Sequence, residues 1–229
     1  MKKPAINYLE FRFSRLKEPR FAHVWLLLDW FAYIAMYILT ERLIPVERCH
    51  VVRCALDDVI PFHEGFLVFY CYWYVLLAGS LLYFFLYDIR NFKRLQVYII
   101  ITQIVALIVY IVWPSIQPLR PDSFARDNIL TRTLAAIYAI DTPTGVCPSL
   151  HAAYSLGIAS VWCKKKEAGF LWKLLIVALV ILVCLSTMFI KQHSAVDVFA
   201  ALPLGLLAEI ILYRDYWKEK WGLFHKRNR

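Results

Sequence analysis

The sequence predicts an all-α polytopic membrane protein, a bundle of six transmembrane helices that forms one domain over residues 1–229. The composition is 61% hydrophobic and only 19% charged, whereas soluble domains average about 25% charged residues. The apolar residues gather in blocks, several of which reach the roughly 20 residues that a helix needs to cross a hydrocarbon core of about 30 Å. There is no internal repeat and no Gly/Ser-rich linker, so a single domain is the simplest organisation.

The predicted spans follow the apolar blocks at about 24–44, 60–87, 96–116, 149–163, 169–190 and 194–213. Blocks rich in Ile and Val would suggest strands in water, but at this length in lipid only a helix satisfies its own backbone. The fourth block is short, and its Ser155 and Gly157 favour close helix packing over lipid contact. The first block follows more than twenty residues and has no small-residue cleavage site, which indicates a retained helix.

The distribution of Lys and Arg predicts the orientation. With six spans both termini lie on one side, and that side holds nineteen Lys and Arg residues against seven on the other. By the positive-inside rule the termini are expected to be cytoplasmic. The net charge of +9 is therefore explained by topology. The basic residues form no continuous face or nucleic-acid motif, which argues against a nucleic-acid partner.

The outer loop at 117–148 is the longest between spans, and long ordered loops tend to be functional. Residues 123–140 are predicted to form an extracytoplasmic surface helix, with Asp122 or Ser123 as its N-cap after Pro121. Three cysteines, Cys49, Cys54 and Cys147, also fall on the outer side. They allow one disulfide at most, and the sequence does not choose the pair.

Three polar segments lie where the bilayer disfavours them. They are Arg120-Pro121 after span three, 147–151 at the start of span four, and 186–197 between spans five and six. The parity of the spans places all three on the outer face. We therefore expect them to form one site.

His193 and Asp197 are four residues apart, so on a helix the carboxylate can reach a ring N–H of the histidine. This contact fixes the tautomer and makes the other ring nitrogen a better nucleophile or base. His151 is expected in the first turn of span four. The pattern predicts a nucleophile with its own acid–base partner.

Three further residues are candidates for binding an anion at this place. Ser149 offers a hydroxyl group at a helix N-terminus, where backbone N–H groups attract negative charge. Arg120 and Lys191 supply positive charge, and an arginine can bind two phosphate oxygens at once. Together these residues predict a phosphate site.

These segments resemble the motifs of the type-2 phosphatidic acid phosphatase superfamily (lipid phosphate phosphatases), which are K-x6-R-P, P-S-G-H and S-R-x5-H-x3-D. The chain shows, in the same order, Arg120-Pro121, Pro148-Ser149-Leu150-His151 and Ser186-x6-His193-x3-Asp197. The P-S-L-H form is similar to a bacterial branch that itself resembles inositol phosphorylceramide synthases. The resemblance covers about 120–197 by motif and the whole chain by its six-helix layout.

The resemblance implies a metal-independent mechanism without a cofactor. His193 attacks phosphorus to give phosphohistidine, Asp197 orients His193, and His151 acts as general acid and then as general base. Ser149, Arg120 and Lys191 are implied to hold the phosphoryl oxygens. Two departures stand out. Trp113 occupies the place of the family lysine and Thr187 that of the family arginine, and Lys191, Arg126 or Arg132 are candidates to replace them.

The predicted function is therefore an enzyme of lipid metabolism, a membrane phosphatase that hydrolyses a lipid phosphate monoester or diphosphate at the extracytoplasmic face. One alternative is a phosphotransferase, or lipid headgroup synthase, that resolves the same intermediate with an alcohol. A second alternative is a non-enzymatic lipid transporter or binding protein, which would carry polar residues at mid-bilayer and repeated broken helices. The expected location is a bacterial plasma membrane. The lipid substrate and the oligomeric state are left open.

Overall fold

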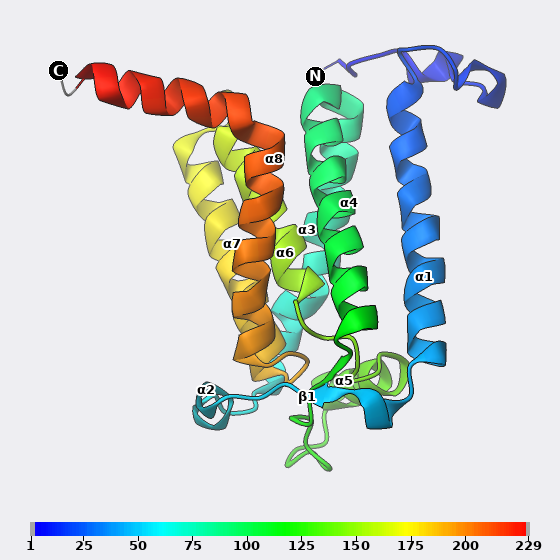
Figure 1. Cartoon of the computed structure of the whole chain (residues 1–229), viewed down its shortest axis with the longest axis vertical. Coiled ribbons are helices and arrows are strands. Elements are labelled where there is room, and N and C mark those ends of the chain that lie inside the picture. The colour runs from blue at the N-terminus through cyan, green and yellow to red at the C-terminus, as the bar shows by residue number, and fades with distance from the viewer. Residues whose placement is uncertain (1–2, 228–229) are drawn as a thin grey trace.

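The computed structural model describes residues 3–227, with side chains described as far as Trp217, and is a bundle of long helices joined at one end by short elements (Figure 1). The long helices are α1 (Asp29–Leu43), α3 (Leu67–Tyr87), α4 (Ile89–Val112), α6 (Leu150–Lys164), α7 (Phe170–Phe189) and α8 (Ala195–Arg227). The short elements are α2 (Ala55–Val59), α5 (Ile129–Ile140), the strands β1 (His50–Val51) and β2 (Ser115–Ile116), and five 3-10 helices among the described residues, the longest at Ala22–Leu28. The predicted all-α class is confirmed in its mostly helical content.

Five helical stretches within the described part of the chain are long and apolar enough to cross a membrane: Ala22–Leu43, Glu64–Tyr87, Ile89–Val112, Phe170–Phe189 and Ala195–Trp217. The predicted fourth span corresponds to α6, which has 15 residues and so a length of only about 22 Å. α6 contacts α3, α4, α7 and α8, and nine of its side chains are buried. This helix is thus surrounded by protein, and its short length needs no match to the lipid thickness.

Several predicted span boundaries differ from the helix ends, and α3 for example begins at Leu67 instead of 60. The third helix begins at Ile89 instead of 96, because the Asp88 side chain accepts a hydrogen bond from the backbone N–H of Asn91 and caps a polar first turn. It ends at Val112 instead of 116, since Pro114 follows and Ser115–Ile116 form β2. Hydropathy marks where a helix is apolar, whereas capping decides where it begins.

The predicted surface helix also starts later than expected. α5 begins at Ile129, and its N-cap is Asn128 instead of Asp122 or Ser123. The Asn128 side chain accepts hydrogen bonds from the backbone N–H groups of Leu130 and Thr131, at 2.9 and 3.1 Å. The hydroxyl oxygen of Thr131 in turn accepts the backbone N–H of Asn128, which completes a capping box.

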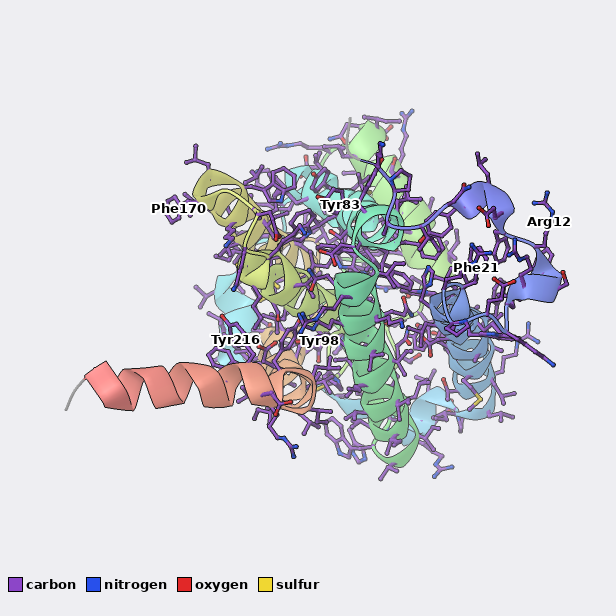
Figure 2. The ribbon with its side chains drawn as sticks, turned by 90° about the horizontal axis from the view of Figure 1, so that it is seen from above. Arg12, Phe21, Tyr83, Tyr98, Phe170 and Tyr216 are labelled. Atoms are coloured by element: carbon purple, nitrogen blue, oxygen red, sulfur yellow. The ribbon has the colours of Figure 1, made fainter. Side chains whose placement is uncertain are left out.

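The end of the bundle that carries α2, α5 and β1 lies opposite the two described chain ends (Figure 1). β1 pairs in parallel with β2, with His50 opposite Ser115 and Val51 opposite Ile116. At the other end α8 bends at Tyr213, whose φ of −119° and ψ of 21° are not helical. Seen from above, the segment after this bend projects away from the bundle (Figure 2).

Tyr98 of α4, labelled in Figure 2, packs where α4 meets α6 and α8. A Cβ atom added at Gly157 of α6 would lie 2.5 Å from the Tyr98 ring, and one added at Gly205 of α8 would lie 2.6 Å from its hydroxyl. Both glycines therefore allow α4, α6 and α8 to approach closely, as expected for Gly157 from the sequence.

All six cysteines are free thiols. The disulfide that the sequence left open among Cys49, Cys54 and Cys147 is therefore absent. Cys147 is buried, and burial raises the pKa of its thiol to about 12. A neutral thiol of this kind is a poor nucleophile.

Candidate active site

The structure brings the second and third sequence motifs together at the end of the bundle opposite the described chain ends. Ser149 and His151 begin α6, while His193 and Asp197 flank the start of α8. The backbone N–H of Ser149 donates to the carbonyl oxygen of Asp197 at 2.9 Å and joins the two segments directly. Arg120 approaches them from the loop that follows β2, and Gln192 links it to the turn beside His193.

His193 lies between Asp197 and His151. Its Nδ1 is 3.2 Å from Oδ2 of Asp197, and its Nε2 is 3.3 Å from Nδ1 of His151. Oδ2 of the fully buried Asp197 also accepts the backbone N–H of Ser194 at 3.0 Å. An ionised carboxylate only accepts hydrogen bonds, so it assigns the proton to Nδ1 and the lone pair to Nε2 of His193. The nitrogen with the lone pair faces His151.

The direct contact between the two imidazoles has a consequence for substrate binding. A phosphoryl group between them needs about 3–3.5 Å from the nucleophile to phosphorus and about 2.6–3.2 Å from the acid to the leaving oxygen. The observed 3.3 Å between the ring nitrogens is far shorter than that combined length. The rings must therefore move apart when a substrate enters.

Aromatic rings hold His151 in place. The ring of Tyr70 lies 4.9 Å and that of Trp73 lies 4.4 Å from the imidazole, measured between centroids. Its Nε2 has no hydrogen-bond partner among the described residues. Both rings belong to α3, outside the sequence motifs, and no motif signal marks them.

Arg120 is half-buried and held by neutral acceptors. It donates to the backbone carbonyls of Tyr138 and Asp141, at 3.1 and 2.7 Å, and to Oε1 of Gln192 at 2.6 Å. Its guanidinium also lies 4.5 Å from the centroid of the Tyr138 ring. Its Nε–H is buried and lacks an acceptor among the described residues. The residue is thus positioned beside the site with one donor unused.

Gln192 links Arg120 to Asp141 beside His193, and it is not among the residues predicted for the site. Its amide nitrogen donates to Oδ2 of Asp141 at 2.9 Å and lies 3.3 Å from the Tyr70 hydroxyl, while its oxygen accepts from Arg120. Burial raises the pKa of the Asp141 carboxyl group above its usual value. The only sequence signal for Gln192 is its place next to His193.

The placement of Lys191 does not match its predicted role as a phosphate ligand. Its ammonium group donates to the backbone carbonyls of Asp57, at 2.9 Å, and Ile60, at 2.5 Å. The residue has a positive φ of 54°, and this left-handed backbone directs the side chain toward α2. Burial lowers the pKa of this ammonium group. The lysine therefore ties the turn before α8 to α2.

Ser149 is also used by the protein itself. Its hydroxyl oxygen accepts the backbone N–H of Ala152 at 3.4 Å, so it is the N-cap of α6. Its side chain is fully buried. As placed, it orders the helix start that carries His151, and it does not line the cavity described below.

Asp57 caps the start of α8, although it is not among the residues predicted for the site. Its Oδ1 accepts the backbone N–H of Ala195 at 2.8 Å, and its Oδ2 accepts the Ser194 hydroxyl at 2.6 Å and the backbone N–H of Cys54 at 2.9 Å. Burial alone would raise the pKa of this carboxyl group, but these hydrogen bonds together lower it. An anion at a helix N-terminus is stabilised by the helix dipole.

The side chains of the two residues that replace family cations make their contacts outside the imidazole pair. Trp113 stacks on His50, with ring centroids 5.1 Å apart. Thr187 bonds its hydroxyl to the carbonyl of Cys184, and its own carbonyl accepts the backbone N–H of His193 at 3.0 Å. Arg126 and Arg132, the other substitutes considered, make contacts with Glu64 and Asp127.

His151 and His193 open onto a cavity of about 510 Å³. Its walls come from α1, α3, the end of α4, the 140–146 segment, the start of α6 and the turn before α8. Eight of the lining residues are Trp or Tyr, with Tyr33 and Tyr37 from α1 and Trp73 from α3 among them. Within the described residues, no group of three His, Cys, Asp or Glu side chains is arranged to hold a metal ion.

Comparison with known proteins agrees with the motifs. Residues 93–221, more than half of the chain, match the family model described as the PAP2 superfamily. The matched region contains α4 to α8, and therefore both histidines, Asp197 and Arg120. No curated protein and no solved structure shows a significant match.

Proposed function

The chain belongs to the PAP2 superfamily, whose members are generally phosphatases or related phosphotransferases, and from this premise we propose that it is a membrane lipid phosphatase. The long apolar helices are compatible with an integral membrane protein. The proposed substrate is a lipid phosphate monoester or diphosphate, which the bilayer supplies.

The proposal rests mainly on two hydrogen bonds, one from His193 to Asp197 and one between His193 and His151, at the wall of a cavity. The lone pair on Nε2 of His193 attacks phosphorus, and an N–P bond forms while the bond from phosphorus to the leaving oxygen breaks. His151 acts as the acid from its imidazolium form, protonated on both ring nitrogens, and becomes a neutral imidazole when it gives its Nδ1 proton to that oxygen. His151 then removes a proton from water, whose oxygen attacks phosphorus and releases His193. General acid–base catalysis of this kind typically contributes about 10²–10⁴-fold.

Phosphate binding is proposed for two groups. The Nε–H of Arg120 is buried and has no acceptor among the described residues, and an arginine donor suits a phosphoryl oxygen. The first turn of α6, ordered by Ser149, presents backbone N–H groups and the positive end of a helix dipole. Lys191 is left out of this list because its ammonium group is bound to α2.

The extracytoplasmic face is proposed as the side of catalysis. The excess of Lys and Arg predicts cytoplasmic termini. The start of α8, next to the turn that carries His193, lies at the end of the bundle opposite the described chain ends (Figure 1). A bacterial plasma membrane remains the proposed location.

The test compares native protein with His193→Ala on a panel of lipid phosphates, with Asp58→Asn as a control because Asp58 is exposed and pairs with Arg53. We expect phosphate release by the native and control proteins, and a loss of at least about 10²-fold in His193→Ala. Acid-labile phosphate trapped on native protein but not on His193→Ala would identify the phosphohistidine.

The same experiment separates the alternatives. If an added alcohol captures the phosphoryl group in place of water, the protein is a phosphotransferase. Equal release by native protein and His193→Ala would end the catalytic assignment and leave a non-enzymatic lipid-binding role.

A further inference from the structure

The cavity beside the imidazole pair has an unexpected charge. Of the described residues that line it, none is Lys or Arg, whereas two are carboxylic acids, Glu41 of α1 and Asp141 after α5. A phosphate ester brings further negative charge to the same cavity. Because like charges at short range in a poorly hydrated site repel strongly, the lining does not suit an anion alone.

Only neutral groups bind the two carboxylates among the contacts that the structure describes. Glu41 accepts hydrogen bonds from the hydroxyl groups of Tyr37, at 3.0 Å, and of Thr142. Asp141 accepts from the amide of Gln192 at 2.9 Å. Arg120 lies beside it and donates to its backbone carbonyl at 2.7 Å, but no hydrogen bond from a cation to either carboxylate group is seen among the described residues. Glu41 also lies in the stretch Ala22–Leu43, which is apolar enough to cross a membrane. Ionisable residues in such stretches are usually functional and need a partner.

The rest of the lining is suited to a cation. Trp30, Tyr33 and Tyr37 of α1 face the cavity together with Tyr70, Trp73 and Tyr74 of α3. The faces of aromatic rings carry negative electrostatic potential, and aromatic cages of this kind bind ammonium groups. Tyr37 both lines the cavity and binds Glu41, so rings and carboxylate meet at one wall.

This wall is connected to the reacting centre by a short series of contacts. Glu41 binds Thr142, the neighbouring Asp141 binds Gln192, and Gln192 precedes His193. All of these side chains line the same cavity as His151. The nucleophile and the two carboxylates therefore border the same cavity.

We propose that the cavity is a binding site for zwitterionic phosphate esters, with the phosphate at His193 and an ammonium headgroup among the α1 and α3 rings beside Glu41. This inference rests on the proposed function for the position of the phosphate at His193. Because a lipid phosphate that carries an ammonium headgroup is a phosphodiester, this headgroup extends the substrate class beyond the monoesters and diphosphates named above. The cation neutralises the carboxylates, which an uncharged polyol headgroup does not do.

Binding is measured in a non-ionic detergent with two soluble esters that share dihexanoyl chains, one with a phosphocholine and one with a phosphoglycerol headgroup. The His193→Ala protein prevents turnover during the measurement. Glu41→Gln is added to this background to remove the charge while keeping the shape. Glu47→Gln is the matched control, because Glu47 lies in the 3-10 turn after α1 and outside the cavity.

We expect the phosphocholine ester to bind about tenfold more tightly than the phosphoglycerol ester, and Glu41→Gln to abolish this preference. Glu47→Gln should keep it. Equal affinities for the two esters, or an equal loss of both in Glu41→Gln, would overturn the proposal. Tighter binding of the phosphoglycerol ester would point to a polyol headgroup instead.

A separate result tests the proposed function. If the phosphocholine preference is found but the native protein converts no phosphate ester, with all products analysed by mass spectrometry, the enzyme assignment fails and the cation subsite stands. If the native protein hydrolyses lipid phosphates but shows no headgroup preference in binding, the enzyme assignment stands and the cation subsite fails.

Discussion

The hydrogen bond between His151 and His193 determines which nitrogen can react. Asp197 holds the proton of His193 on Nδ1, so Nε2 accepts from Nδ1 of His151. His151 then keeps its own lone pair on Nε2, which has no partner among the described residues. In this state Nε2 of His193 carries a lone pair, which is the form that the first step needs. His151 is a neutral imidazole here, so it becomes a general acid only when its Nε2 gains a second proton.

At the same scale, Lys191 is predicted to act as a tether. Lys191→Gln removes two charge-assisted hydrogen bonds to the carbonyls of α2, which are worth about 1.5–3 kcal/mol for bonds to charged groups. We expect the melting temperature to fall by about 5 °C, while KM for a lipid phosphate changes less than about threefold. Thermal unfolding in detergent and steady-state kinetics check this, with the exposed Lys166→Gln as control.

A tenfold rise in KM with an unchanged melting temperature would instead restore Lys191 as a phosphate ligand. The two outcomes differ because a tether acts on the folded protein and a ligand acts on the bound substrate.

At the scale of elements, the start of α8 depends on Asp57 in α2. Asp57→Ala leaves the N–H of Ala195 and the hydroxyl of Ser194 without their acceptor, and loss of such a cap costs about 0.5–2 kcal/mol. Because the folded pKa of Asp57 is lowered below its usual 3.8, its contribution is present above that pH and is lost as pH falls through the folded value.

We therefore expect Asp57→Ala to be less stable than native protein at pH 7. The difference in stability between the two proteins should shrink below about pH 4. Unfolding followed by circular dichroism between pH 3 and pH 7 provides the comparison. Asp58→Ala, which removes only an exposed ion pair with Arg53, serves as control. Parallel pH curves for native protein and Asp57→Ala would contradict the capping role.

The contact between α4 and α6 depends on Gly157. A methyl group at this position would lie 2.5 and 2.8 Å from two carbons of the Tyr98 ring, and overpacking of a core typically costs about 1–3 kcal/mol. Gly157→Ala should lower the free energy of unfolding by that amount, and adding Tyr98→Leu should recover part of it. Gly79→Ala in α3, where the added methyl group meets nothing within 4 Å, should be neutral or stabilising. An unchanged stability of Gly157→Ala would show that the helices can move apart at no cost.

At the scale of the whole molecule, the site and the described chain ends lie at opposite ends of the bundle (Figure 1). The distribution of nineteen and seven basic residues predicts which end is cytoplasmic. In a cysteine-free background, Asp122→Cys should react with a membrane-impermeant maleimide added to intact cells. Lys166→Cys should react only after the cells are permeabilised, and the opposite pattern would place the imidazole pair on the cytoplasmic side.

Much of the candidate site could be predicted from the sequence because its chemistry is local. The spacing of His193 and Asp197 predicted their contact, although His193 lies in the turn before α8 and not on the helix itself. Span parity placed His151 on the same side. Hydropathy predicted the helical class for the same reason, since each apolar block is contiguous. Boundaries failed at Asp88 and Asn128, where a single side chain caps a polar turn that hydropathy does not register.

The sequence by itself therefore determined the helical class, the order of the motifs and the likeness of 93–221 to the PAP2 superfamily, because these follow from contiguous or regularly spaced residues. Only the tertiary structure decided how each side chain is used. The left-handed backbone of Lys191 sends its ammonium group to α2, and Glu41 meets Thr142 across 101 residues of chain. The physical reason is that a contact between distant segments depends on how the helices pack, which no local pattern of residues encodes.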